Sequence, residues 1–272
     1  MKRNEVETAV FLALNAVQKS YNGQTALEPL SLSVNAGESI AVIGPSGSGK
    51  TTLLNLMAGV IQPDSGAIML GGRELSGLRP GGELSRLVGV IHQQFDLVPQ
   101  LSVLHNVLAG RLGDWGLVQS LLSLVWPRER HVALQALERV GIQEKAAERA
   151  ARLSGGEKQR VAIARLLVQD PQMIIADEPV SSLDPARAED ILDMLTGIAK
   201  ERGKTLIASI HTLDISSTDI SSSYFSRVIG LREGRVQFDL PMHELSQRRL
   251  TNLYQLPLRV EKETSVGVPA DS

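Results

Sequence analysis

The 272-residue sequence contains no cysteine, no large excess of charge of either sign and no long hydrophobic run. Without cysteine the chain has no disulfides, no thiolate metal sites and no cysteine nucleophile, and this composition suits a reducing compartment. The formal net charge of −2 argues against a strongly basic nucleic-acid-binding protein. We therefore expect no nucleic-acid partner.

The sequence also lacks the pattern of a membrane-spanning segment. Its most apolar later stretch, LVQSLLSLVW from Leu117 to Trp126, has about half of the roughly 20 residues that a spanning helix needs. The opening MKRNEVETAVF has no long apolar region behind its basic residues, so we expect no secretory signal. A soluble chain is expected, which acts at a membrane only through partner chains.

Hydrophobic residues make up 43% of the chain and charged residues 21%, which is enough apolar material for a substantial core. Three short segments rich in Ile, Val, Leu and Ala, at residues 38–44, 173–177 and 205–211, are predicted to be buried strands. Apolar residues at helical spacing predict helices at residues 50–58 and 186–203, the first stopping at Gly59 and the second ending at Gly203. Strands that alternate with helices indicate an α/β fold around a mostly parallel sheet.

Other regions follow different patterns. Residues 11–34 and 66–75 predict short strands of a small antiparallel β layer, and residues 225–239 predict a hairpin that turns at Glu233–Gly234. Helical spacing from about residue 102 to 167 predicts an inserted helical subdomain. We therefore expect one domain at residues 1–256, with the sheet core and β layer at about 1–95 and 168–256 and the helical subdomain at about 96–167. The polar residues 257–272 are predicted to form a disordered tail.

The stretch GPSGSGKT, from Gly44 to Thr51, has the spacing of a phosphate-binding P-loop. Its glycines let successive backbone N–H groups surround an anion, and the following helix directs the positive end of its dipole at that anion. Lys50 would reach the β- and γ-phosphates, and the Thr51 hydroxyl would help to hold Mg²⁺. The alternative is a glycine-rich turn before an ordinary helix. A P-loop alone does not separate GTPases, kinases, helicases and transporter ATPases.

Two carboxylates follow the apolar strand in MIIADEP. Asp177, at the strand end, can hold Mg²⁺ through its water shell. Glu178 is placed to orient and polarise an attacking water. The alternative is a strand that ends in two solvated acids.

A second anion-binding helix start is predicted at LSGGEKQR, where Ser154 and two glycines precede a helix. Ser154 with Glu157 also fits a capping box, and the two interpretations are compatible. One nucleotide does not need two phosphate loops from one chain, whereas two chains that share nucleotides need both.

LSGGEKQR, which lies between the P-loop and IIADEP, closely resembles the signature of ATP-binding-cassette (ABC) ATPases. The resemblance extends from about Leu12 to Tyr254. It implies a P-loop NTPase fold of the RecA-like type, with a mostly parallel sheet, an N-terminal antiparallel β layer and an inserted helical subdomain. It also implies ATP and Mg²⁺ as cofactors.

The resemblance assigns roles to further residues. Tyr21 matches the aromatic residue that stacks on adenine, and Gln93 matches a glutamine of the Mg²⁺ shell, although His92 before it departs from the family pattern. Asp184 in SSLDP matches an acid of the dimer interface, and His211 matches the switch histidine at the γ-phosphate. The implied ATP contacts are Tyr21, Gly44, Pro45, Ser46, Gly47, Ser48, Gly49, Lys50, Thr51 and Thr52, with Ser154, Gly155, Gly156 and Asp184 contributed in trans. The implied metal ligands are Thr51, Gln93 and Asp177, and the implied catalytic residues are Glu178, His211, Gln93 and Lys50.

The implied mechanism needs two ATPase subunits, expected as a head-to-tail homodimer. ATP lies between the P-loop of one subunit and the SGG segment of the other, so that binding closes the dimer and hydrolysis reopens it. A single cassette resembles the detached ATPase of a bacterial transporter. The implied partners are permease subunits and, indirectly, a periplasmic or extracellular substrate-binding protein, and the implied location is the cytoplasmic face of the membrane.

Several segments together resemble the phosphonate importer ATPases, namely QQFDLVPQLSVLHNVLAGRLG, ALERVGIQEKAAERAARLSGGEKQRVAIAR, ADEPVSSLDP and VIGLREGRVQFD. This subfamily implies import of phosphonate or a related phosphorus oxyanion. Export or lipoprotein-release ATPases remain an alternative because their cassettes carry the same motifs. A soluble cassette protein acting on DNA or ribosomes is a further alternative, disfavoured by the single cassette and the lack of cysteine. A regulator without turnover is disfavoured by Glu178 and His211.

Overall fold

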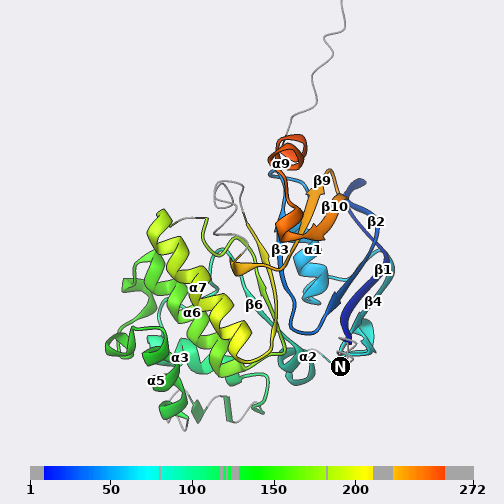
Figure 1. The fold of residues 1–272 in the computed structure, drawn as a ribbon. Helices are drawn as coiled ribbons and strands as arrows, with labels where there is room; N and C mark the ends of the chain where they lie inside the picture. Colours follow the sequence, from blue (N-terminus) through cyan, green and yellow to red (C-terminus); the bar gives the residue numbers. More distant parts are fainter. Residues whose placement is uncertain are drawn as a thin grey trace, which may run out of the picture.

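The computed structural model describes residues 9–79, 81–116, 119–120, 122–123, 129–181, 183–210 and 223–254. Within these residues the chain forms two sheets and the helices that pack against them (Figure 1). Most of the apolar stretch 117–126 and all of the predicted tail 257–272 lie outside the described residues. None of the helices in the described ranges is both long and apolar enough to cross a bilayer.

The larger sheet has six strands in the order β10-β9-β3-β8-β7-β6. Five strands run parallel, and β10 pairs antiparallel with β9. The β9–β10 turn falls at Glu233–Gly234 as predicted, and both residues have positive φ. The predicted α/β fold around a mostly parallel sheet is therefore confirmed. The strands span Ser39–Ile43 (β3), Val88–Ile91 (β6), Met173–Ala176 (β7), Thr205–Ser209 (β8), Arg227–Arg232 (β9) and Arg235–Pro241 (β10).

The six-stranded sheet has a hydrophobic core on each face. On β3, Ile40 and Val42 belong to one core, whereas Ala41 and Ile43 belong to the other. Successive side chains of a strand point to opposite faces, so a strand buried on both sides needs a continuous apolar run. This explains why the central strands could be recognised in the sequence without alternation of polar and apolar residues.

The core that contains Ile40 and Val42 lies between the six-stranded sheet and a four-stranded antiparallel sheet of order β2-β1-β4-β5. It includes residues of α1 (Lys50–Met57). The predicted antiparallel layer is present, although β1 and β2 have 12 residues each rather than being short. Register shifts along β1 allow such long strands to bend while they stay paired. The strands span Val10–Tyr21 (β1), Gln24–Asn35 (β2), Ser65–Leu70 (β4) and Arg73–Glu74 (β5).

Helices α3, α5, α6 and α7 lie on the other side of the six-stranded sheet from β1, β2 and β4 (Figure 1). Helix α6 is buried over most of its length from Gln159 to Val168, where its apolar residues belong to the core that contains Ala41 and Ile43, and it continues past residue 167, the expected end of the helical subdomain. The α-helices span Gly82–Leu87 (α2), Val103–Leu108 (α3), Arg130–Arg139 (α5), Gly155–Gln169 (α6), Pro185–Glu201 (α7) and Gln247–Tyr254 (α9). Short 3-10 turns cover Leu75–Gly77 (η1), Ala109–Arg111 (η2), Gln143–Lys145 (η3), Ala150–Arg152 (η4) and Met242–Glu244 (η6).

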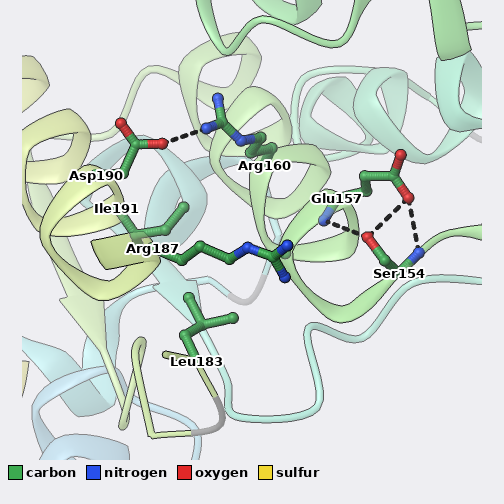
Figure 2. A pocket seen from close by; sticks show the side chains of 8 residues that line it. Ser154, Glu157, Arg160, Leu183, Arg187, Asp190 and Ile191 are labelled. Atoms are coloured by element: carbon green, nitrogen blue, oxygen red, sulfur yellow. Dashed lines mark hydrogen bonds and ion pairs between the residues drawn. The ribbon is translucent and has the colours of Figure 1, made fainter. Parts of the chain in front are cut away.

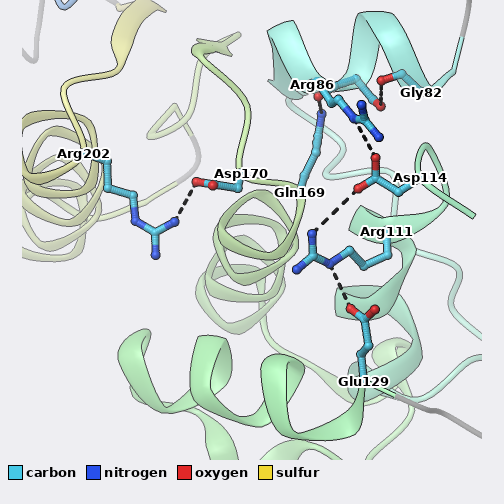
Figure 3. A network of polar contacts seen from close by, with 9 residues as sticks. Gly82, Arg86, Arg111, Asp114, Glu129, Gln169, Asp170 and Arg202 are labelled. Atoms are coloured by element: carbon cyan, nitrogen blue, oxygen red, sulfur yellow. Dashed lines mark hydrogen bonds and ion pairs between the residues drawn. The ribbon is translucent and has the colours of Figure 1, made fainter.

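Polar contacts fix α6 against the edge of the sheet (Figure 3). The Gln169 amide, at the end of α6, donates to the carbonyl oxygens of Ser85 and Val88 at 2.8 Å each. On the same edge, Arg86 Nε of α2 donates to Asp114 Oδ1 at 2.9 Å. The start of β6 and the end of α6 are therefore held together, so the loop that follows β6 starts from a fixed position.

Candidate active site

The loop between β3 and α1 places backbone N–H groups at a helix N-terminus. β3 ends at Ile43 and α1 begins at Lys50, with Gly49 as its N-cap. Gly47 and Gly49 have φ angles of 77° and 102°, a region that favours glycine. A Cβ atom on Gly49 would lie 2.6 Å from the Ala26 carbonyl oxygen, so the close approach of β2 also requires glycine. The other predicted contacts of this segment lie on the same loop or the first turn of α1, namely Gly44, Pro45, Ser46, Ser48, Thr51 and Thr52.

The Lys50 side chain folds back over this loop. Its Nζ donates to the carbonyl oxygens of Gly44 at 2.8 Å and of Pro45 at 3.2 Å. Burial lowers the pKa of Lys50, and the nearby carboxylates of Glu178 and Asp177 partly oppose that change. The P-loop lysine therefore lies near two consecutive acids that are far from it in the sequence.

The two acids lie where β7 leaves the sheet. Asp177 is 9% exposed, and its Oδ1 accepts a hydrogen bond from the Ser209 hydroxyl at 2.7 Å. The same Ser209 oxygen accepts the backbone N–H of Glu178 at 2.7 Å. Glu178 has a φ of 49°, a left-handed conformation that is uncommon for a residue with a side chain. Strained backbone of this kind is often found at functional sites.

Ser209 was not among the residues predicted from the sequence. It is fully buried at the end of β8, and parallel pairing of β7 with β8 brings it beside Asp177. A hydroxyl at the carboxyl end of the apolar strand TLIAS is the only sequence signal for this role. That signal becomes specific only when the strand order is known.

Gln93 lies in the loop after β6 and is exposed. Arg165 of α6 holds this loop by donating to the carbonyl oxygens of Phe95 at 2.9 Å and Asp96 at 2.8 Å. Both of these loop residues have positive φ. Because β6 is the neighbour of β7, Gln93 and Asp177 follow adjacent strand ends.

The remaining residues predicted for this site are Tyr21 and His211. Tyr21 ends β1 at the hairpin turn, where it is 46% exposed, and Lys19 Nζ lies 5.6 Å from its ring centroid. His211 lies outside the described residues, two positions after the end of β8.

The second predicted anion-binding helix start has the expected capping box. Ser154 is the N-cap of α6, its Oγ accepts the Glu157 N–H at 3.4 Å, and Glu157 Oε2 accepts the Ser154 N–H at 2.8 Å. Hydrogen bonds from Ser154 lower the pKa of Glu157. Added Cβ atoms on Gly155 and Gly156 would meet no atom within 4 Å, so this turn is open on its outer side.

A cavity of about 270 Å³ lies between the start of α6 and α7 (Figure 2). Asp184 is the N-cap of α7 and accepts the Arg187 N–H at 3.2 Å. On the far wall Arg160 forms an ion pair with Asp190. The lining residues are Ser154, Gly156, Glu157, Arg160, Leu183, Arg187, Asp190 and Ile191, and they come from the α6 and α7 regions.

The predicted metal ligands have donor atoms of a kind that suits a magnesium ion. Thr51, Gln93 and Asp177 offer a hydroxyl, an amide and a carboxylate, all of them oxygen ligands of the kind that Mg²⁺ prefers. Within the described part of the chain, no group of three or more His, Cys, Asp or Glu residues could hold a metal by itself. A magnesium ion at these residues would therefore need further oxygen ligands, which water or phosphate could supply.

Comparison with known proteins gives consistent matches over most of the chain. The family model described as ABC transporter matches residues 27–181. Phosphonates import ATP-binding protein PhnC 1 of Pseudomonas aeruginosa is 44% identical over 252 residues, which is 92% of each chain. Phosphonates import ATP-binding protein PhnC of Rhizobium meliloti is 39% identical over 265 residues, 95% of this chain and 93% of the relative.

Two of the solved structures with a similar fold contain a bound nucleotide or a nucleotide conformation in their descriptions. A dimeric ATP-binding cassette in a post-hydrolysis state, bound to ADP and Pi, has a TM-score of 0.73 and 30% identity over 85% of this chain and 99% of that chain. The ADP conformation of an ATP-binding cassette of an ABC transporter has a TM-score of 0.72 and 28% identity over 86% of this chain and 92% of that chain. The predicted P-loop NTPase fold is thus confirmed.

Proposed function

Since this chain belongs to the ABC transporter family, as an ATP-binding and ATP-hydrolysing subunit, we propose that it drives the import of phosphonates or related phosphorus oxyanions. The observation that supports the ATPase most directly is the meeting of Lys50 with Asp177 and Glu178 beside the P-loop. The phosphonate assignment is supported by the relatives of that name, whose similarity covers about nine-tenths of this chain.

We assign nucleotide binding to the loop before α1. Its backbone N–H groups and the dipole of α1 attract the phosphates, and Lys50 exchanges its contacts with Gly44 and Pro45 for phosphate oxygens. Tyr21 stacks on adenine. Mg²⁺, when held by Thr51, Gln93 and Asp177, supplies positive charge that neutralises the phosphates.

Hydrolysis is assigned to Glu178, with His211 and Gln93 completing the site. The Glu178 carboxylate accepts a hydrogen bond from the attacking water and orients it, while Lys50 stabilises charge that develops on the transferred phosphoryl group. His211 contacts the γ-phosphate. The Ser209 hydroxyl supports both acids, because it is bonded to the Asp177 side chain and to the Glu178 backbone.

The open start of α6 is assigned to a second subunit's nucleotide. Ser154, Gly155 and Gly156 present N–H groups at a helix N-terminus, and Asp184 lies beside the same cavity region. We propose a head-to-tail homodimer in which each of these segments completes the partner's site. The helical subdomain at about residues 96–167 would then move with α6 relative to the sheet core.

The remaining partners follow from the family. We propose permease subunits that dock against the helical subdomain at the cytoplasmic face of the membrane, together with a substrate-binding protein that delivers the phosphonate from outside. Substrate choice lies with those partners, so this chain supplies energy rather than selectivity.

A growth test addresses the proposed substrate. A strain lacking this gene is supplied with a phosphonate as its sole phosphorus source, and we expect no growth, with rescue by inorganic phosphate. A plasmid copy of the wild-type gene should restore growth on phosphonate, whereas a copy with Glu178→Gln should not. Normal growth and normal phosphonate uptake in the deletion strain would contradict the proposal.

A further inference from the structure

The C-terminal helix α9 reaches the first residue of the P-loop. The backbone N–H of Gly44 donates to the Tyr254 hydroxyl oxygen at 3.1 Å, across 210 residues of sequence. Gly44 is buried, and its carbonyl oxygen accepts the Lys50 Nζ hydrogen bond. One glycine is therefore held on its amide side by Tyr254 and on its carbonyl side by the P-loop lysine.

Helix α9 is itself held in place by apolar and polar contacts. Leu250 and Leu253 are 4% and 2% exposed and belong to the core on the helical side of the sheet. Arg232, at the end of β9, donates from Nη1 to the Asn252 carbonyl oxygen at 3.0 Å. Figure 1 shows α9 beside the end of β9 from which this arginine extends.

The end of β9 also packs tightly against Gly44. A Cβ atom on Gly44 would lie 2.0 Å from the Leu231 carbonyl oxygen, so the loop start has almost no room to shift toward β9. The Tyr254 hydroxyl approaches the same glycine from α9. The position of Gly44 is therefore determined by two segments from the C-terminal part of the chain, neither of which belongs to a nucleotide-binding motif.

We propose that Tyr254 is a positioning residue that keeps Gly44, and through it Lys50, in the arrangement that receives nucleotide phosphates. The inference rests on the proposed nucleotide site. A buried N–H without an acceptor is unfavourable, so loss of the hydroxyl would let the loop start relax toward another acceptor. Nucleotide binding would then have to restore the loop, which weakens affinity.

The test uses the full-length chain with Tyr254→Phe, which keeps the ring and removes the acceptor. We expect the Kd for MgATP and the Kd for MgADP to rise about threefold to tenfold, measured by titration calorimetry. Both nucleotides should be affected because they share the phosphates that this loop surrounds. The melting temperature should change little, since the apolar packing of the ring is retained.

Tyr224→Phe is the matched control. Burial raises the pKa of Tyr224 to about 12, together with the hydrogen bond from its hydroxyl to Asp193 of α7. The control therefore also removes one tyrosine hydrogen bond, but one that does not involve the P-loop. We expect its Kd values for both nucleotides to match those of the wild type.

The outcomes separate this inference from the proposed function. If the wild type binds MgATP while Tyr254→Phe binds it equally well, or loses only thermal stability, Tyr254 is not a positioning residue. If the wild type itself does not bind MgATP, the proposed function fails. Should Tyr254→Phe not fold, Arg232→Gln tests the same point by loosening α9 at Asn252, and an unchanged Kd in that variant would overturn the inference.

Discussion

At the residue scale, single hydroxyl and amino groups determine how the site is arranged. Ser209 joins the Asp177 side chain to the Glu178 backbone through one oxygen, and Glu178 keeps a left-handed φ of 49° with that support. Removing the hydroxyl leaves a buried carboxylate oxygen without its donor and a backbone N–H without its acceptor.

We predict that Ser209→Ala lowers the ATP turnover rate about tenfold or more, because Glu178 is no longer held in the geometry that orients water. MgATP affinity should stay within about twofold of wild type, since the phosphates bind mainly to the P-loop. Turnover and Kd are measured on the same preparation. Thr205→Val is the control, because it removes a buried hydroxyl at the opposite end of β8, where Thr205 accepts the Gly37 N–H. Equal turnover in the two variants would show that Ser209 has no special role.

We predict that Lys50 makes the affinity for MgATP depend on pH. Burial lowers its pKa below the ordinary value of 10.5, so the ammonium group loses its proton at a lower pH than an exposed lysine does. The charged form attracts phosphate. MgATP affinity should therefore be greatest below the lowered pKa and should fall as the pH rises through it.

The measurement is the Kd for MgATP between about pH 7 and 10, for the wild type and for Lys50→Arg. Arginine stays charged throughout this range, so the variant should bind more weakly overall but with a flat profile. The same decline in both proteins would mean that the pH dependence comes from another group.

At the scale of elements, helix α6 connects the two halves of the proposed mechanism. Ser154 caps its start, and Arg165 near its C-terminal end holds the loop that contains Gln93. Burial lowers the pKa of Arg165, with Asp96 partly opposing that change. A movement of the helix would therefore be transmitted to the loop after β6.

We predict that Arg165→Met lowers the free energy of unfolding by about 1–3 kcal/mol, because two carbonyl oxygens in left-handed turns lose their donors. Methionine keeps much of the apolar stem, so the loss reports mainly on the hydrogen bonds. Urea denaturation measures it. Arg202→Met, which removes an exposed ion pair with Asp170, should change stability by less than about 1 kcal/mol. Equal losses of unfolding free energy in the two variants would contradict a special role for Arg165.

Local sequence signals predicted most of the helices and strands. The features that these signals did not predict depend on contacts between segments that are distant in the sequence. The central strands were predictable because burial on both faces demands continuous apolar runs, and the ends of α1 and α7 because glycines follow them. The left-handed Phe95 and Asp96 were not predictable, since their conformation accompanies a contact with Arg165, about 70 positions away. The roles of Ser209 and Tyr254 likewise depend on strand order and on the docking of α9.

At the scale of the whole molecule, the proposed function needs two sites, each of which is incomplete in a single chain. The P-loop with Asp177 and Glu178 forms one, and the start of α6 beside the α7 cavity forms the other. Two chains arranged head to tail would complete both. This is consistent with the dimeric cassette of the same fold that was solved with ADP and Pi bound.

The most direct test of this account measures the mass of the Glu178→Gln protein by sedimentation, with and without MgATP. The substitution keeps ATP binding but removes the carboxylate that polarises water. With MgATP we therefore predict a stable dimer of twice the 29.4 kDa chain mass and no turnover. Adding Ser154→Asp preserves the N-cap but places negative charge against the partner's phosphates, so this double variant should bind ATP and stay monomeric. A Glu178→Gln protein that remains monomeric with ATP bound, or that hydrolyses ATP like the wild type, would contradict the account.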